Sequence, residues 1–386
     1  MSTFVDSQKQ NVDELKTQFS DYMNAKIKTP SKLSELKDGE FRLATYNIHY
    51  FTDANEKQNT YDGIISDIQS INADVIGLEE FVLGNKIKIK DQLEVDTTHF
   101  YDDISRIGYD KSILCNSVPS WYKSLYGNVA LISNRRCKDI CTELDETIHT
   151  FDKSTSTVVV SGSHQGTVET RCFIFLSIKY NQYTFRIYIT HLDVASEELR
   201  ANQIEYIFKD SQRFNAENDV VFVMGDFNSF IPSELDDVVN RQKILKDSGD
   251  NKLTDWRTND ILRENGKVFQ KIQEYGFIDC HETNKEIMTT WNTTRVDFIL
   301  CNKKLMGGQF RAEYLYTLNS DHIPVVLTLT PDVQFITSTA DSYVTQRSHV
   351  SRSRSKRKST KNKRSGRGNK NRTTKQTSRR HTKTKK

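Results

Sequence analysis

Several features that would assign this sequence to common classes of protein are missing. No stretch of the 386 residues approaches the roughly 18 consecutive apolar residues of a membrane-spanning helix, which excludes an integral membrane protein of that kind. The first residues, Met1 to Lys28, lack the apolar segment of a secretory signal, so we expect an intracellular protein. Aliphatic and aromatic residues make up only 36% of the chain, which predicts that part of it is not packed.

The motifs of two large groups of enzymes are also absent. Neither G-x-x-x-x-G-K-[ST] nor G-x-G-x-x-G occurs, so nucleotide binding at a helix N-terminus has no support. The nucleophile motif G-x-S-x-G is missing as well. If the protein acts on a phosphoester, this absence favours direct attack by water over a covalent intermediate.

Acidic residues are absent from the end of the chain. Arg347 to Lys386 contain 18 Lys or Arg and no Asp or Glu, which leaves 37 basic against 51 acidic residues in the first 346. Because that body has a net charge of −14, it is not expected to attract a polyanion by general charge. The tail is typical of non-specific nucleic-acid binding or nuclear import, and the alternatives are an anionic membrane surface or a solubilising end.

Cysteine is sparse, with six residues scattered through the chain. Cys172 and Cys301 lie in apolar, strand-like runs and are interpreted as small core residues. We therefore expect reduced thiols.

The chain divides into four parts by composition. Residues 1–40 are expected to form an N-terminal extension with a weak helix from Val12 to Ile27, and residues 41–330 are expected to form the main folded domain. Residues 331–346 are expected to be a linker. Residues 347–386, rich in Ser, Thr, Asn, Gly, Lys and Arg, are expected to be a disordered basic tail.

Strands and helices alternate through the central part, which suggests sheets covered by helices within one domain. Helices are predicted at Tyr61–Ile71 and Ser196–Phe214, and two marginal helices between Pro232 and Ile272. Strands are predicted at Phe41–Ile48, Ala73–Phe81, Tyr126–Ser133, Thr170–Tyr180, Tyr183–Thr190, Asp219–Gly225, Thr289–Trp291, Arg295–Leu300 and Val325–Thr330.

Polar side chains stand at or beside the ends of these apolar strands, where α/β sheets form their sites. A carboxylate with an amide and waters suits Mg²⁺, which keeps much of its hydration in proteins. Two histidines and further acids supply acid–base groups and hydrogen-bond donors for a phosphoryl oxygen. Singly, each has a bland explanation, such as a cap or a half-buried histidine. The set is Asn47, Glu79, Glu80, His191, Asp193, Asp226, Asn228, Asp297, Asp321 and His322.

Seven segments in order resemble the motifs of one family, the endonuclease/exonuclease/phosphatase superfamily of Mg²⁺-dependent enzymes. They are Thr45-Tyr46-Asn47-Ile48-His49, Ala73 to Glu80, Gly127 to Ser133, Thr190-His191-Leu192-Asp193 with Arg200 and Gln203, Gly225-Asp226-Phe227-Asn228-Ser229, Arg295 to Leu300, and Ser320-Asp321-His322. The resemblance implies a four-layer α/β sandwich, two central sheets flanked by helices.

The resemblance also implies a role for each residue. Glu80 is the main ligand of Mg²⁺, with Mn²⁺ as an alternative, while Asn47 and Asp321 approach the metal. Asp226 orients or deprotonates the attacking water. Asn228 fixes the phosphate, and His191 is a phosphate ligand or an acid. His322 contacts the phosphoryl oxygens, with Asp297 fixing its tautomer. Glu79 and Asp193 are outer neighbours of the metal.

Two positions depart from the family's pattern. Glu79 stands where the family usually has Gln, and we expect it to add negative charge beside the metal. His49 stands where abasic-site endonucleases carry an acid, which makes that branch less fitting than the generic hydrolase branch, with its sphingomyelinase-like and tyrosyl-DNA phosphodiesterase-like neighbours.

The predicted function is Mg²⁺-dependent hydrolysis of a phosphodiester or phosphomonoester, with nucleic acid or a nucleic-acid adduct as the favoured substrate. The basic tail carries the substrate part of this prediction and suggests nuclear or nucleic-acid association. Two alternatives stay open: a sphingomyelinase-like or inositol-phosphate hydrolase, and a catalytically silent binding module on the same scaffold.

Overall fold

A computed structural model describes residues 32–53, 56–90, 93–116, 125–133, 141–151, 157–158, 168–169, 171–194, 196–214, 217–229, 231, 266–282, 289–290 and 295–337. These residues all belong to one compact unit, Met1–Ser338. The predicted helix Val12–Ile27 and the basic tail 347–386 lie outside the described residues.

The first mixed sheet has the strand order β16-β17-β1-β2-β6-β5. Its strands are β1 (Phe41–Asn47), β2 (Val75–Leu83), β5 (Lys111–Asn116), β6 (Leu125–Ile132), β16 (Phe310–Tyr314) and β17 (Val325–Leu329). Only β1 and β2 are parallel among these neighbours. The helix α2 (Tyr61–Ile71) connects them, as a parallel pair requires a crossover, and its bounds are those predicted.

The second mixed sheet has the order β13-β14-β12-β11-β10-β7. Its strands are β7 (Cys141–Thr150), β10 (Cys172–Tyr180), β11 (Tyr183–His191), β12 (Asp219–Asp226), β13 (Ile278–Asp279) and β14 (Asp297–Cys301). The consecutive strands β10 and β11 are antiparallel and form a hairpin around Asn181. The parallel pair β11 and β12 is joined by α5 (Glu197–Ser211), so each sheet contains one βαβ unit.

Smaller elements complete the described part. They are η1 (His49–Phe51), α3 (Phe100–Arg106), α8 (Lys267–Glu274), and the pairs β3 (Ile87–Lys90) with β4 (Leu93–Val95), β8 (Thr157–Val158) with β9 (Val168–Glu169), and β15 (Lys303–Leu305) with β18 (Phe335–Thr337). β18 falls within the segment expected to be a linker. None of the described helices combines the length and the apolar character needed to cross a membrane.

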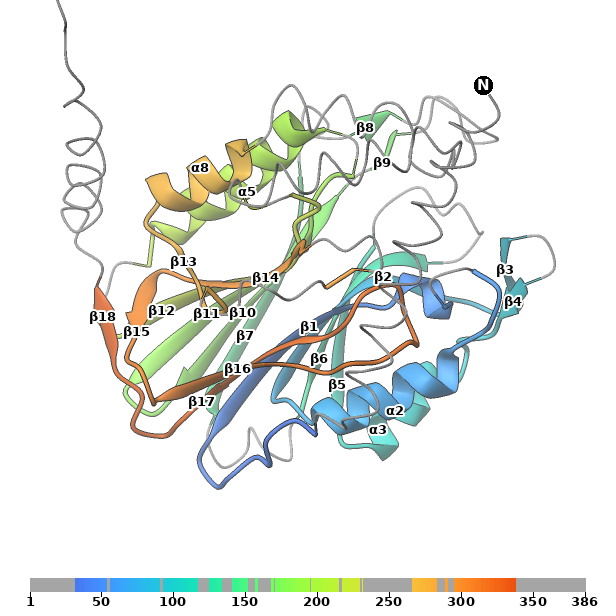
Figure 1. Ribbon diagram of the computed structural model, residues 1–386, viewed down its shortest axis with the longest axis horizontal. Helices are drawn as coiled ribbons and strands as arrows, with labels where there is room; N and C mark the ends of the chain where they lie inside the picture. Colours follow the sequence, from blue (N-terminus) through green and yellow to red (C-terminus); the bar gives the residue numbers. More distant parts are fainter. Residues whose placement is uncertain are drawn as a thin grey trace, which may run out of the picture. The chain divides into compact units, whose positions relative to one another are not determined.

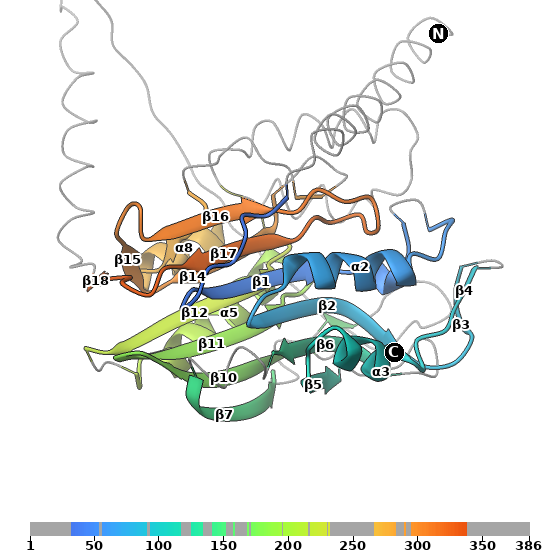
Figure 2. The same ribbon diagram turned by 90° about the horizontal axis from the view of Figure 1, so that it is seen from below.

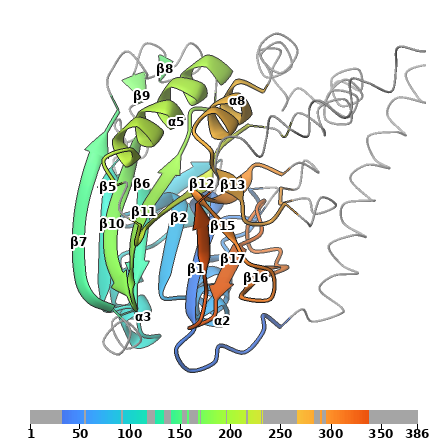
Figure 3. The ribbon, with the colours of Figure 1, turned by 90° about the vertical axis from the view of Figure 1, so that its left-hand side faces the viewer.

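Three hydrophobic clusters show how the layers stack. The inner cluster joins residues of both sheets, such as Leu43 and Phe222, so the sheets pack face to face. The second cluster buries the other face of the first sheet under α2 and α3, and the third buries the other face of the second sheet under α5 and α8. Figures 1 to 3 show these helices on opposite outer faces. The predicted four-layer α/β sandwich is confirmed.

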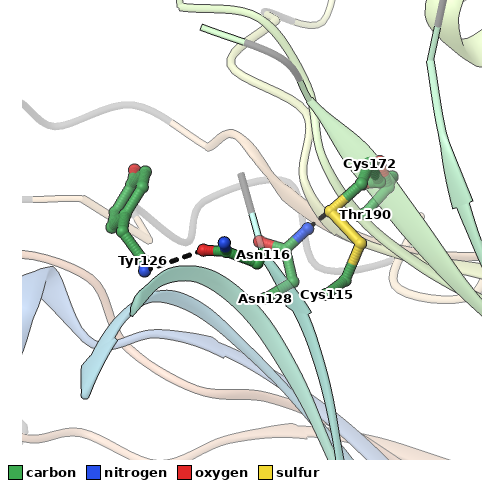
Figure 4. Close-up of a disulfide and its surroundings, with 6 residues drawn as sticks. All are labelled: Cys115, Asn116, Tyr126, Asn128, Cys172 and Thr190. Carbon is green, nitrogen blue, oxygen red and sulfur yellow. Dashed lines mark hydrogen bonds between the residues drawn. A yellow bond between two sulfur atoms is a disulfide. The ribbon is translucent and has the colours of Figure 1, made fainter. Parts of the chain in front are cut away.

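The expectation of reduced thiols is wrong for one pair of cysteines. Cys115 on β5 and Cys172 on β10 form a disulfide, with their Cα atoms 6.4 Å apart. Figure 4 shows this bond running from one sheet to the other, with Asn128 donating a hydrogen bond to the Cys172 carbonyl oxygen. The two cysteines are 57 positions apart, and only the packing of the sheets brings them together. Among the described residues Cys280 and Cys301 are free and buried.

Candidate active site

The predicted site residues meet where central strands of both sheets end. In the parallel pairs, Asn47 is the register partner of Glu79, and His191 is the register partner of Asp226. Asp226 is in turn opposite Asp297 on the antiparallel strand β14. Parallel strands bring their carboxyl ends to one edge, so residues far apart in the sequence converge there.

The carboxylate of Asp226 is the centre of this group. Its Oδ2 accepts a hydrogen bond from Asn47 Nδ2 at 3.0 Å, which ties the second sheet to the first. The same oxygen lies 3.5 Å from His191 Nε2 and 3.9 Å from His322 Nε2. The other oxygen, Oδ1, accepts from the Asn228 backbone N–H at 2.7 Å. Four of the predicted site residues, Asn47, His191, His322 and Asn228, therefore lie next to this one carboxylate.

Burial changes the acidity of Asp226, whose residue is only 1% exposed. Loss of hydration raises the pKa of its carboxyl to about 7, against the opposing effect of the His322 charge. The Asp297 carboxylate adds to the rise. A carboxyl with a pKa near neutrality is suited to taking a proton from water.

Gly225 makes the approach of β12 to β11 possible. Its φ is +144°, a backbone conformation that L-residues rarely adopt, and a Cβ there would lie 1.7 Å from the Thr190 carbonyl oxygen. The glycine therefore allows the close contact that places Asp226 beside His191. The sequence motif includes Gly225, but the motif alone does not reveal this role.

His322 is held by Asp297. Its Nδ1 lies 2.9 Å from Asp297 Oδ2 and 3.1 Å from Oδ1, so Nδ1–H donates to this carboxylate and Nε2 is turned to the site. Burial alone would lower the pKa of His322, but the carboxylates of Asp297, Asp321 and Asp226 raise it well above the usual range. The imidazole is therefore positively charged at neutral pH.

The loop before His322 is anchored to β1. Ser320 Oγ donates to the Asn47 carbonyl oxygen at 2.7 Å and accepts from the His322 backbone N–H at 3.2 Å. Ser320 thus fixes the loop between β16 and β17 to β1 at the site, and it is a positioning residue that the sequence alone did not reveal.

His191 and Asn228 form a second contact pair. Asn228 Nδ2 lies 2.9 Å from His191 Nε2 and donates to the Leu192 carbonyl oxygen at 3.3 Å. His191 Nε2 is also 4.0 Å from Glu80 Oε1. Asn228 has a φ of +48°, a left-handed conformation that Asn tolerates better than most residues. The pair therefore bridges Asp226 and Glu80.

The two consecutive glutamates of β2, Glu79 and Glu80, lie in a β-bulge. The register with β6 shifts between Leu78 and Phe81, and Glu80 has a φ of +55°. Such a bulge re-aims a side chain at the end of a strand. Glu79 is fully buried and accepts a hydrogen bond from Thr45 Oγ1 at 2.7 Å, whereas the Glu80 side chain is 17% exposed.

The expected negative charge at Glu79 requires correction. Burial raises the pKa of its carboxyl well above the usual range, and the nearby Asp297 and Asp226 carboxylates raise it further. The neutral, protonated form of Glu79 is therefore favoured. It presents a donor and an acceptor, as the family's Gln would.

Asp193 lies at the base of α5. Its Oδ1 accepts from the Ser196 backbone N–H at 3.0 Å, and its own N–H donates to Gln203 Oε1 at 2.8 Å. Its carbonyl oxygen accepts from Arg200 Nη1 at 3.0 Å. These contacts fix the chain between β11 and α5.

Three side chains of the site carry oxygen atoms of the kind that fits a hard divalent cation. Glu80 and Asp321 offer carboxylate oxygens and Asn47 an amide oxygen, the ligand types that Mg²⁺ prefers. Within the described residues, the close group of metal-binding type is Asp226, Asp297 and His322, with ligand atoms within 4.8 Å of one another. The excess of carboxylates over imidazoles is a negative field that a cation would offset.

The sequence profile of the Endonuclease/Exonuclease/phosphatase family matches residues 44–322, a range that includes all ten predicted site residues. Among curated proteins, no sequence matches the chain.

Three solved structures that resemble this chain at low sequence identity are described next. An endonuclease/exonuclease/phosphatase from Beutenbergia cavernae is 13% identical, with a TM-score of 0.48 over 77% of this chain and 72% of that one. An endonuclease/exonuclease/phosphatase family protein from Leptotrichia buccalis is 18% identical, with a TM-score of 0.47 over 76% of this chain and 99% of that one. The human Nocturnin catalytic domain is 14% identical, with a TM-score of 0.46 over 79% of this chain and 98% of that one.

Proposed function

We propose a hydrolytic function for this chain, which belongs to the endonuclease/exonuclease/phosphatase family. The reaction is the attack of water on a phosphoester, assisted by a divalent metal ion. The observation that carries this proposal is the Asp226 carboxylate, which lies within 3.0–3.9 Å of Asn47, His191 and His322. The family match supports the class of reaction, and the site geometry supports the assignment of roles.

Glu80 is proposed to hold the metal ion together with Asn47 and Asp321. When bound, Mg²⁺ or Mn²⁺ offsets negative charge on the phosphoryl oxygens. Asn47 also donates to Asp226, so the same residue would connect the metal side of the site to the group that acts on water.

The other residues surround the reacting phosphate. Asp226 orients the attacking water and accepts its proton, which its raised pKa of about 7 favours. His322, positively charged and fixed by Asp297, donates from Nε2 to a phosphoryl oxygen. Asn228 and His191 contact the phosphate as well. Positioning and neutralisation of charge would supply most of the rate acceleration.

Nucleic acid, or an adduct of it, is the substrate that we favour. The support is the tail Arg347–Lys386, whose 18 basic residues follow a body of net charge −14. Such a tail would hold a polyanion near the site and would also suit nuclear or nucleic-acid-associated localisation.

An activity panel tests the proposal. Purified full-length protein is assayed with MgCl₂, MnCl₂ or EDTA on single- and double-stranded DNA, RNA, 5′-tyrosyl-DNA, sphingomyelin and inositol phosphates, with Asp226→Asn as the inactive control. Metal-dependent hydrolysis of a nucleic-acid substrate is the expected result. Preference for sphingomyelin or inositol phosphates would favour the alternative hydrolases. No hydrolysis of any substrate by the wild type would favour the silent binding module.

A further inference from the structure

A buried carboxylate outside the reacting group contacts the loop that carries Asn228. Glu197 begins α5 and is only 3% exposed. Ser229, fully buried and next to Asn228, donates its hydroxyl to Glu197 Oε2 at 2.9 Å and lies 3.0 Å from Oε1. A buried carboxylate costs free energy unless it is paired and hydrogen-bonded, so these contacts stabilise Glu197 inside the protein.

Two further donors complete the surroundings of Glu197. Arg200 Nε donates to Oε2 at 3.0 Å, and the Val268 backbone N–H at the start of α8 donates to Oε1 at 3.1 Å. Arg200 in turn donates from Nη1 to the Asp193 carbonyl oxygen at 3.0 Å. The carboxylate therefore joins three segments: the loop after β11, the loop after β12, and the start of α8.

Two of these segments carry residues of the site. The loop after β11 follows His191, and the loop after β12 carries Asn228, whose Nδ2 lies 2.9 Å from His191 Nε2. Asn228 also has a left-handed backbone, with φ +48°, which persists only where the surroundings fix it. The bond from Ser229 to Glu197 lies directly beside this strained residue.

We propose that Glu197 and Ser229 are positioning residues, which clamp the Asn228 loop so that Asn228 and His191 face the phosphate together. This inference rests on the proposed function for its kinetic consequence, whereas the clamp itself is a property of the fold. Neither side chain touches the reacting atoms, so each acts through Asn228.

The first test is kinetic, with bis(4-nitrophenyl) phosphate and MgCl₂ as the probe. Ser229→Ala removes the hydroxyl and leaves the Glu197–Arg200 pair in place. It should lower kcat roughly tenfold, since small misplacements of a contact group have effects of that size, with KM within about twofold. The matched control is Ser211→Ala: Ser211 is also buried on α5, but its hydroxyl donates to the Phe208 carbonyl oxygen. Its kcat should be that of the wild type.

A double-mutant cycle shows whether the effect passes through Asn228. Asn228→Ala combined with Ser229→Ala should be no slower than Asn228→Ala alone. If the two losses multiply, or if Ser229→Ala equals the Ser211 control, the proposal is overturned. Glu197→Gln, which loses the charge paired with Arg200, should lower kcat in the same direction, and Ser229→Ala decides the matter if that variant fails to fold.

The second test does not depend on turnover. Hydrogen exchange, measured by mass spectrometry on the peptide that contains Asp226 to Ser229, should be faster in Ser229→Ala and unchanged in Ser211→Ala. Faster exchange in a protein that hydrolyses nothing would uphold the clamp and reject the proposed function. Unchanged exchange would reject the clamp, whatever the activity.

Discussion

At the scale of single residues, the protonation states of Asp226 and His322 depend on each other. The two side chains are 3.9 Å apart, and each changes the pKa of the other in the direction that favours an ion pair. Burial opposes charge on both groups, and the Asp297 carboxylate decides the balance for the histidine because it bonds directly to Nδ1. In the proposed reaction, transfer of a proton from water to Asp226 would therefore leave His322 protonated.

Glu80→Ala tests the metal at the same scale. We expect turnover to fall by at least about a hundredfold, because the main charged ligand is lost and the remaining donors bind a cation weakly. The fold should survive, since the Glu80 side chain is partly exposed at 17%. Isothermal titration with MnCl₂ and turnover with and without EDTA provide the measurements. Full activity of this variant in EDTA would end the metal hypothesis.

Asp297→Asn keeps the shape of the side chain but removes its charge. We expect kcat to fall about a hundredfold, because the imidazole loses the partner that orients it and raises its pKa. Since the pKa of His322 then drops, the alkaline limb of the kcat profile should move to lower pH. A pH–rate profile of both proteins checks this. An unchanged alkaline limb would show that the proton on His322 is not required.

At the scale of elements, strand ends do the positioning. The bulge in β2 turns Glu80 toward the site and leaves Glu79 between the sheets, so two adjacent glutamates differ in burial and in their neighbours. The end of β12 depends on a glycine for its close contact with β11. Small backbone irregularities therefore set the geometry that the regular strands alone would not produce.

Gly225→Ala tests that contact. The added Cβ would lie 1.7 Å from the Thr190 carbonyl oxygen, so β12 must shift, and we expect a loss of about 3 kcal/mol or more together with loss of activity. Gly307→Ala is the matched control, because a Cβ added there would have nothing within 4 Å. Urea unfolding of both variants gives the comparison. Equal midpoints would show that the strand accommodates the methyl group.

His281, just after β13, predicts a pH dependence of stability. It is fully buried, and its Nε2 lies 3.0 Å from the Val326 carbonyl oxygen on the other sheet. Burial lowers the pKa of this imidazole to about 4, so the folded protein holds it neutral while the unfolded chain protonates it near pH 6.5. The contribution of neutral His281 to the free energy of unfolding is fully present above pH 6.5. As the pH drops toward 4, the free energy of unfolding falls by about 3 kcal/mol.

Chemical unfolding at several pH values measures this loss. In His281→Leu the stability should fall less steeply between pH 6.5 and 4, although it should be about 1 kcal/mol lower at pH 7.5 without the bond to Val326. Parallel curves for the two proteins would show that another group is responsible.

At the scale of the whole molecule, charge is divided between body and tail. The first 346 residues have a net charge of −14, and the tail contributes 18 positive charges. The proposed site itself is rich in carboxylates, which would repel a polyanion unless a metal ion or another part of the chain compensates. The tail is the part of the sequence with the charge to do so.

Truncation after Asp341 tests this division. We expect the truncated protein to lose most of its binding to DNA or RNA and most of the salt dependence of that binding, because cation release scales with the number of phosphate contacts. Turnover of bis(4-nitrophenyl) phosphate should be nearly unchanged, as every proposed site residue precedes Ile323. Fluorescence-anisotropy titrations at several salt concentrations measure the first effect. Binding equal to that of the full chain would show that the tail is not the anchor.

The sequence by itself determined the repeating pattern of strands and helices and the kinds of side chain at the strand ends. Period-2 and period-3.6 alternation are local properties of the sequence. The predicted bounds of α2 therefore equal the observed ones, and the predicted end of β12 differs by one residue. The sequence does not predict β5 and β7, because both lie at sheet edges and the apolar residues of β7 (Cys141, Leu144 and Ile148) do not alternate with polar ones. The apolar alternation that marks a half-buried strand is missing there.

Only the tertiary structure decided which of these residues meet. Asn47 forms a hydrogen bond with Asp226, 179 positions away, and Cys115 forms a disulfide with Cys172, 57 positions away. Both contacts exist because two sheets pack face to face. Local sequence patterns do not determine the order of strands in those sheets. The orientation of Glu80 depends on a bulge, and the charge of Glu79 depends on its burial. Burial and orientation are properties of the packed molecule, so they follow from the fold and not from the residue type.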